Sequence, residues 1–187
     1  SADVLEALGV NVNLDHKRLG HLVDTIGIGF MFAPNYHPAM KYVAPVRKEL
    51  EIRTMFNLLG PLTNPASAKR QVVGVYSKEL TITFAKVLQK LGSKHVLVVH
   101  GEDGMDEISI TGKTFIAELK DNVIKEYTIR PSLFKLKEGS LKDIVVEDSS
   151  HSKKMILDIL NGKLSVGRNI ALLNAGAAIY VSGLAND

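Results

Sequence analysis

The sequence predicts an α/β fold in which helices flank a mixed, mostly parallel β-sheet. A strand-like run at residues 71–76 is followed by an apolar stripe with helical spacing at residues 80–91 and by an apolar strand at residues 96–99. Strand, helix and strand joined by short connections describe a βαβ unit, whose two strands run parallel. The parallel part of the sheet is therefore expected between residues 71 and 99.

A hairpin adds an antiparallel part to the predicted sheet. Residues 115–119 and 123–129 are strand-like and flank Asp121-Asn122. Asp and Asn favour the tight turns that join antiparallel strands. The sheet is for this reason expected to be mixed.

Helices are predicted at both ends of the chain, with one further strand near the N-terminus. A serine cap and a stop at Gly9 indicate a first helix, and helical spacing predicts several others. The expected elements are helices at residues 1–9, 15–24, 149–161 and 168–182, a helix opening at His37-Pro38, and a buried strand from Ile26 to Ala33. Because helices stand at both ends, we expect the chain to be cut at both ends.

Length and composition favour one globular domain. The 187 residues are 45% hydrophobic, enough for a sizeable core, so residues 1–187 are expected to form a single α/β domain. No apolar run approaches the ~20 residues of a membrane span, and the N-terminus lacks a signal peptide. A soluble, cytoplasmic protein without membrane contacts is expected. The absence of cysteine excludes disulfides, thiolate nucleophiles and the usual structural zinc sites.

The charge distribution argues against nucleic acid as a partner. The net charge is +3, but the basic residues occur as isolated pairs separated by acids. A modest positive balance fits small anionic ligands equally well.

Four carboxylates follow directly after the strand at residues 96–99: Glu102, Asp103, Asp106 and Glu107. Ligands of parallel α/β sheets bind beyond the carboxyl ends of the strands. Crowded carboxylates raise one another's pKa or recruit a cation, and oxygen ligands favour Mg²⁺ or a similar hard cation. The alternative is a solvated turn that binds nothing. Since neighbouring residues of a strand point to opposite faces, Asp106 and Glu107 can share one metal only on an irregular turn; otherwise the pair requires two metals.

Two proline-bearing stretches supply further candidates. Arg47 and His37 can lie on one side of the helix that opens at His37-Pro38, and a guanidinium is the planar fork that binds a carboxylate. Alternatively, Arg47 belongs to a solvated charged face and His37 caps the helix. Gly60 and Pro61 lie in a rigid, apolar loop that can form a pocket wall, or that merely connects two elements.

Four stretches, taken together, resemble the anthranilate phosphoribosyltransferase family. They are SADVLEALG, NYHPAMKYVAPVRKELEIRTMFNLLGPLTNPA, GEDGMDEIS and LLNAGAAIYV, and they occur in the family's order along essentially the whole chain. Members transfer the phosphoribosyl group of phosphoribosyl pyrophosphate to the amine of anthranilate, with Mg²⁺, in tryptophan biosynthesis. The resemblance implies the catalytic-domain fold that these enzymes share with nucleoside phosphorylases.

The resemblance also implies roles for single residues. Asp106 and Glu107 match the pair that holds Mg²⁺ against the pyrophosphate, and Arg47 matches the arginine that binds the anthranilate carboxylate. No residue stands out as a catalytic nucleophile, and Glu102 and Asp103 receive no role.

The remaining matched positions concern the two substrates. Those that match the lining of the anthranilate channel are His37, Gly60, Pro61 and Tyr36, and Ser1 matches a serine near bound phosphoribosyl pyrophosphate. A hydroxyl at a helix N-terminus suits a phosphate.

The sequence departs from the family by omission. Members carry a helical segment, a glycine-rich phosphate loop and a Lys-His-Gly-Asn-Arg motif ahead of the position of Ser1, and they continue past Asp187. We therefore expect these residues alone to be inactive and the parent enzyme to be a homodimer. Two alternatives stay open here: an enzyme like the pyrimidine nucleoside phosphorylases, or a non-catalytic binding module.

Overall fold

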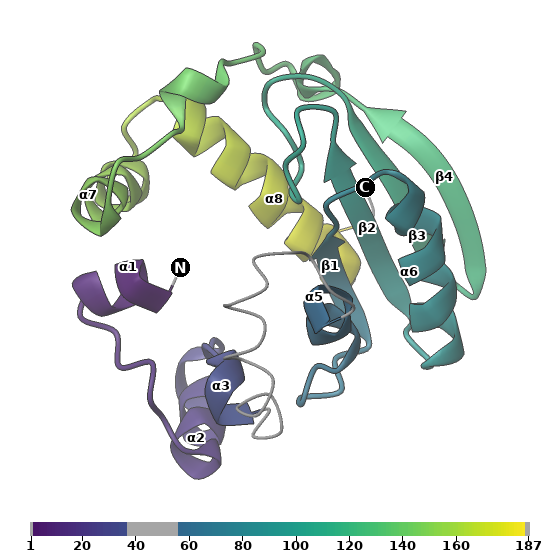
Figure 1. Cartoon of the computed structure of the whole chain (residues 1–187), viewed down its shortest axis with the longest axis horizontal. Helices are drawn as coiled ribbons and strands as arrows, with labels where there is room; N and C mark the ends of the chain where they lie inside the picture. Colours follow the sequence, from purple (N-terminus) through teal and green to yellow (C-terminus); the bar gives the residue numbers. More distant parts are fainter. Residues whose placement is uncertain (1, 37–55, 186–187) are drawn as a thin grey trace. The chain divides into compact units, whose positions relative to one another are not determined.

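The computed structural model describes residues 2–36 and 56–185 and divides the chain into two compact units (Figure 1). The first unit comprises Ser1–Gly60 with Val146–Leu157, and the second comprises Pro61–Val145 with Asp158–Asp187. That the chain is a single domain stays a prediction.

A four-stranded sheet forms the centre of the second unit. Its strands, in sheet order, are β1 (Arg70–Gly74), β2 (His95–Gly101), β3 (Thr114–Lys120) and β4 (Val123–Ile129). β1 and β2 are parallel, whereas β2–β3 and β3–β4 are antiparallel. The predicted mixed α/β fold, its βαβ unit and its hairpin are thus confirmed. Among the described residues one of three strand pairings is parallel, fewer than the expected majority.

The hairpin turn follows from its two central residues. Asp121 and Asn122 have φ angles of 50° and 63°. Asn and Asp tolerate this left-handed region better than other side chains, and a turn of this hand matches the twist of the strands. These two residues therefore set the register in which Lys120 pairs with Val123.

Two helices cover opposite faces of the sheet: α6 (Glu79–Lys90) and α8 (Val166–Ser182) (Figure 1). Alternate residues of β2 face the two helices, which is why β2 is buried on both sides. On the side of α8 the core includes Leu97, Val99, Ile116, Leu173 and Ala177.

Both ends of α8 are fixed by side chains. Ser165 is the N-cap and accepts a hydrogen bond from the backbone N–H of Arg168. At the other end, Arg70 of β1 donates from Nη1 to the carbonyl of Val181 at 2.7 Å. A cation at a helix C-terminus satisfies free carbonyls and complements the helix dipole. As a result, α8 is tied to the first strand of the sheet.

A buried glutamate joins the sheet to α8. Glu118 of β3 is 9% exposed, and its carboxylate accepts from Tyr180 at 2.7 Å and from Tyr127 at 3.0 Å, with His95 Nε2 at 2.9 Å. Burial alone would raise the pKa of Glu118, but these hydrogen bonds outweigh it and lower the pKa. The network is thus built around an ionised carboxylate.

Short helices follow the sheet. They are η2 (Pro131–Phe134) and η3 (Leu141–Asp143), both of the 3-10 type. In η3, Ser140 and Asp143 form a capping box, which explains why the chain turns there.

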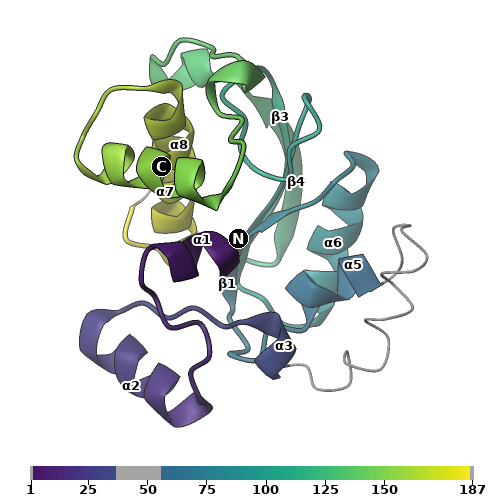
Figure 2. The same cartoon turned by 60° about the vertical axis from the view of Figure 1, so that its left-hand side comes forward.

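The first unit is helical (Figure 2). Its elements are α1 (Ala2–Ala7), α2 (His16–Ile26), α3 (Ala33–Tyr36), α5 (Phe56–Leu59) and the first part of α7 (Ser149–Leu160). The 3-10 helix η1 (Gly60–Leu62) has its first residue in this unit and its other two in the second. Asp15 caps α2 by accepting from the N–H of Arg18 at 2.8 Å. Lys153 of α7 donates to the carbonyl of Ala7 at 2.6 Å. The helices predicted at residues 1–9, 15–24, 149–161 and 168–182 are confirmed.

The predicted strand from Ile26 to Ala33 is wrong. α2 runs through Ile26 and ends at Gly27, whose φ is 79°, and Ile28 is 70% exposed. Gly29 lies against its own preceding helix, because a Cβ there would be 2.7 Å from Leu19. The apolar run therefore reflects a helix end and a loop folded back on it: Gly27 ends the helix, and Gly29 lets the loop pack closely against it.

In the described residues, no helix is both long and apolar enough to cross a membrane. The helix predicted to open at His37-Pro38 lies outside the described residues.

Candidate functional site

The acidic turn, Gly101–Glu107, leaves β2 at its carboxyl end and lies against the end of β1. A Cβ added to Gly74 would overlap the carbonyl oxygen of Asp106, so no residue larger than glycine fits there without displacement. The last residue of one parallel strand thus contacts the turn that follows the other. This is the edge of the sheet at which the sequence predicts a site.

Asp103 holds the turn together. Its carboxylate accepts hydrogen bonds from the hydroxyls of Ser109 and Thr111, both at 2.5 Å, and from the N–H of Met105 at 3.1 Å. Burial would raise the pKa of Asp103, but these bonds outweigh it and lower the pKa. The sequence pattern assigns Asp103 no role. The available signal was the pair of hydroxyls six and eight residues further on.

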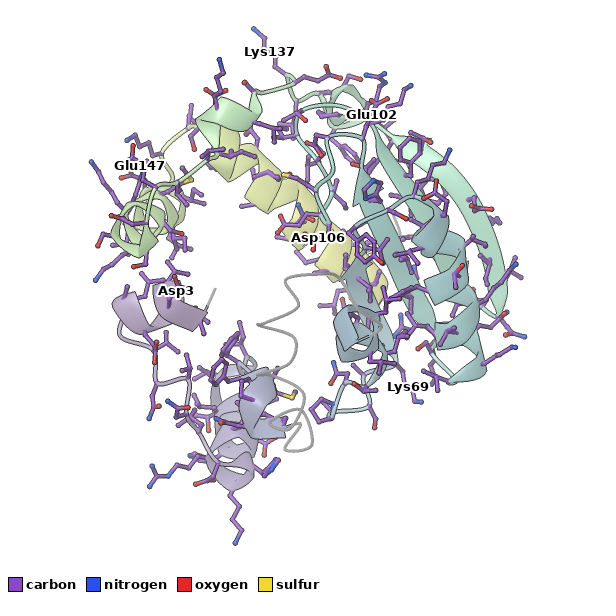
Figure 3. The ribbon with its side chains drawn as sticks, in the orientation of Figure 1. Asp3, Lys69, Glu102, Asp106, Lys137 and Glu147 are labelled. Atoms are coloured by element: carbon purple, nitrogen blue, oxygen red, sulfur yellow. The ribbon has the colours of Figure 1, made fainter. Side chains whose placement is uncertain are left out.

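Glu102 pairs with Lys113: its N–H donates to the carbonyl of Lys113 at 2.8 Å, and its carboxylate accepts from the N–H of Lys113 at 3.4 Å. Its carboxylate forms an ion pair with Lys113 at 3.7 Å, with both side chains more than 40% exposed. Exposed pairs of this kind stabilise weakly. Figure 3 labels Glu102 apart from Asp106, which lies beside α8.

Asp106 and Glu107, the acid pair, are exposed and lack hydrogen bonds and ion pairs to other described residues. The pKa of Glu107 is raised, first because the surrounding protein removes solvent from its carboxylate and second because Asp106 lies next to it. The backbone at both residues is a bend and not a strand. The irregular turn that a shared metal requires is thus present.

The backbone after the acid pair is held by Asn174 of α8. The N–H of Ile108 donates to Asn174 Oδ1 at 2.9 Å, and Asn174 Nδ2 donates back to the carbonyl of Ile108 at 2.9 Å. The side chain of Ile108 is buried in the core between α8 and the sheet. In the sequence, Asn174 stands out only as part of a small-residue run, so this contact was missed.

The donor set of the acid pair fits Mg²⁺. Within residues 2–36 and 56–185, no group of three or more His, Cys, Asp or Glu side chains could hold a metal. Mg²⁺ is usually bound by one or two carboxylates, with substrate phosphates and water completing its shell. Two exposed carboxylates on a fixed turn match that requirement.

The other candidate positions are described only in part. Tyr36 ends α3, its ring meets His16 edge-on at 4.7 Å, and its buried hydroxyl has no hydrogen-bond partner among the described residues. Gly60 and Pro61 open η1. Tyr36 and Gly60 belong to the first unit, whereas Pro61 and the acid pair belong to the second. Ser1, His37 and Arg47 lie outside the described residues.

A cavity of about 560 Å³ lies between α8 and the sheet. Its lining includes Ile108, Ile116, Leu133, Phe134 and Leu173, and no charged side chain of the described residues contributes to it. Phosphates and carboxylates need charged or N–H partners. This cavity is therefore unsuited to an anionic substrate.

An α/β sheet with an acidic turn at the carboxyl end of a parallel strand defines a class of proteins that bind ligands at that edge. The chain belongs to the glycosyl transferase family, whose a/b domain model matches residues 1–187.

Two relatives within the family carry the same enzyme name. The chain is 57% identical to anthranilate phosphoribosyltransferase of Methylobacillus flagellatus and 54% identical to that of Vesicomyosocius okutanii, in both cases over all 187 residues. It spans 55% of the length of each relative.

Solved structures agree with this relationship. The crystal structure of anthranilate phosphoribosyltransferase from Thermus thermophilus matches with a TM-score of 0.92 at 39% identity, over 100% of this chain and 55% of that chain. The Saccharomyces cerevisiae enzyme in complex with PRPP and Mg matches with a TM-score of 0.88 at 29% identity, over 97% of this chain and 53% of that one.

Proposed function

We propose that the chain is part of an anthranilate phosphoribosyltransferase. The enzyme transfers the phosphoribosyl group of phosphoribosyl pyrophosphate to anthranilate in tryptophan biosynthesis. The geometric observation that carries the proposal is the exposed acid pair, Asp106 and Glu107, on a turn fixed at the carboxyl end of β2. The names of the relatives support anthranilate over the nucleoside substrates of the phosphorylases.

In this proposal the acid pair binds the diphosphate through a metal ion. Asp106 and Glu107 would hold Mg²⁺, and the cation would in turn bind the pyrophosphate group. A cation held there would neutralise charge on the departing pyrophosphate. The complex of the yeast relative with PRPP and Mg supports the choice of Mg²⁺ and phosphoribosyl pyrophosphate as the two ligands.

Residues elsewhere in the chain bind the organic substrates. Arg47 binds the carboxylate of anthranilate through its planar guanidinium. The positions that line the path of the aromatic ring are Tyr36, His37, Gly60 and Pro61. The buried hydroxyl of Tyr36, unpartnered among the described residues, is consistent with a position facing a polar group. Ser1 contacts phosphoribosyl pyrophosphate.

The reaction is a displacement at C1 of the ribose. The bond from C1 to the pyrophosphate oxygen breaks, the bond from C1 to the anthranilate nitrogen forms, and the nitrogen loses a proton. The transition state has oxocarbenium character, so the protein contributes alignment and charge neutralisation rather than a nucleophile. We propose that the parent enzyme is a cytoplasmic homodimer and that residues 1–187 alone are inactive.

The experiment is a comparison of two assays on the full-length protein. Anthranilate consumption with phosphoribosyl pyrophosphate and Mg²⁺ is expected to proceed, while phosphorolysis of uridine and thymidine is expected to be absent. The proposal fails if phosphorolysis is the faster reaction, or if anthranilate is not consumed.

A further inference from the structure

We propose that Asn174 is a positioning residue for the acid pair: its carboxamide fixes the backbone from which Asp106 and Glu107 present their carboxylates to the metal. This inference rests on the proposed function, because it concerns how the same site is kept in order. Asn174 itself contacts neither metal nor substrate in this proposal.

The acid pair is bracketed by two anchored residues. On one side, the N–H of Met105 donates to Asp103 at 3.1 Å and its carbonyl accepts from the N–H of Gly101 at 2.8 Å. On the other side, both backbone groups of Ile108 bind Asn174. Only the two acidic residues between them lack such anchors in the described structure. Their backbone is therefore set by what holds Met105 and Ile108, together with the packing of the Asp106 carbonyl against Gly74.

The contact with Asn174 is specific to a carboxamide. Its oxygen accepts from Ile108, and its nitrogen donates to the carbonyls of Ile108 and Ile170, the latter at 3.0 Å. One acceptor and two donors are needed in a fixed arrangement, and only Asn and Gln supply them. An aspartate would retain the acceptor but direct a second oxygen at two carbonyls.

The helix that carries Asn174 is itself held in place. Ser165 caps its first turn, and Arg70 binds its last turn at the carbonyl of Val181. The buried side chains of Leu173 and Ala177, on either side of Asn174, pack in the core. Positions on rigid elements hold a site more accurately than positions on loops. Asn174 thus attaches the acidic turn to a helix that is itself fixed in place.

Loss of this contact is expected to weaken metal binding. Partners that orient metal ligands without touching the metal typically contribute about 10- to 100-fold in affinity. Asn174→Asp and Asn174→Ala in the full-length protein are therefore expected to raise the Kd for the metal by about ten-fold or more. The matched control is Tyr180→Phe, which removes another α8 hydrogen bond, to Glu118, away from the acidic turn.

The test measures binding of Mn²⁺, as a spectroscopic substitute for Mg²⁺, by electron paramagnetic resonance in the presence of phosphoribosyl pyrophosphate. The expected result is weaker Mn²⁺ binding and an altered Mn²⁺ spectrum in the Asn174 variants. The Tyr180→Phe protein should bind Mn²⁺ like wild type, although loss of the hydrogen bond to Glu118 lowers its melting temperature. Asn174→Gln keeps the carboxamide on a side chain one methylene longer, and it replaces Asn174→Asp in the test if that variant does not fold. Its Mn²⁺ affinity is expected to lie between those of Asn174→Ala and the wild type.

Two other outcomes distinguish failure of the positioning role of Asn174 from failure of the proposed metal site. Wild-type affinity in all Asn174 variants would overturn the positioning role and leave the proposed function intact. No Mn²⁺ binding by the wild-type protein with phosphoribosyl pyrophosphate would contradict the metal site itself, and with it this inference.

Discussion

Gly74 and Asp106 are in contact across the end of the sheet: a Cβ on Gly74 would overlap the backbone oxygen of Asp106. β1 ends at Gly74, and the acid pair begins at Asp106. Because Gly74 has no side chain, the backbone of Asp106 can lie directly against the end of β1. This close contact sets the position of the proposed metal ligands relative to the parallel strands.

Gly74→Ala is expected to displace the acid pair and lower kcat/KM of the full-length enzyme by about 100-fold, since misplacement of reacting groups by about 1 Å can cost that much. The measurement is steady-state kinetics over a range of Mg²⁺ concentrations. Gly176→Ala, in the interior of α8 with open space at its Cβ position, is the control and should be neutral. Equal kinetics for both variants would show that the contact does not position the turn.

Asp103→Asn is expected to destabilise the protein at pH 7 by about 1–3 kcal/mol, because a carboxylate that accepts three hydrogen bonds is replaced by an amide. The folded pKa of Asp103 is lowered, so its stabilisation is present above the unfolded pKa of about 3.9 and is lost as pH falls through the folded pKa.

Urea unfolding at pH 7 and pH 3 checks this sign. The difference between wild type and Asp103→Asn should shrink at pH 3. Glu102→Gln, which alters the neighbouring exposed carboxylate, should change stability by less than about 0.5 kcal/mol. A difference for Asp103→Asn that grows on acidification would contradict the assignment.

Glu118→Gln is expected to lower the free energy of unfolding by about 1–3 kcal/mol, because His95, Tyr127 and Tyr180 all meet an ionised carboxylate. The melting temperature of the full-length protein is the measurement. Glu126→Gln, an exposed change on the neighbouring strand β4, is the control and should leave the melting temperature unchanged. A similar melting temperature for both variants would mean that the buried network adds no net stability.

Asp106→Asn and Glu107→Gln are expected to lower kcat/KM by about 100-fold and to raise the Mg²⁺ concentration needed for half activity. Arg47→Ala should instead raise KM for anthranilate and leave the Mg²⁺ requirement unchanged, because it removes a substrate contact. Kinetics at varied Mg²⁺ and anthranilate distinguish the two effects. Unchanged kinetics in all three variants would reject the assignments.

Local patterns in the sequence predicted most elements. The helical spacing at residues 80–91 corresponds to α6, and Asp121-Asn122 indicated the hairpin turn, because both depend on residues close in the chain. The run from Ile26 to Ala33 misled because an apolar segment without clear period fits a strand and a helix end equally well.

The sequence predicted the position of the candidate site but not the contacts that support it. Acidic residues beyond a parallel strand could be found by position alone, and the acid pair lies at that edge. The contacts that order the turn could not be found in this way. Asn174 lies 66 residues from Ile108 in the chain, and no local pattern reports a contact across that separation.

The central claim is that Asp106 and Glu107 hold the metal that binds the diphosphate. The most direct measurement is a crystal structure of the full-length protein with phosphoribosyl pyrophosphate and Mn²⁺, with the metal located by anomalous scattering. The account predicts an anomalous peak about 2.0–2.3 Å from a carboxylate oxygen of Asp106 or Glu107 and in contact with the pyrophosphate. A peak bound only by other residues, with both carboxylates facing solvent, would contradict it.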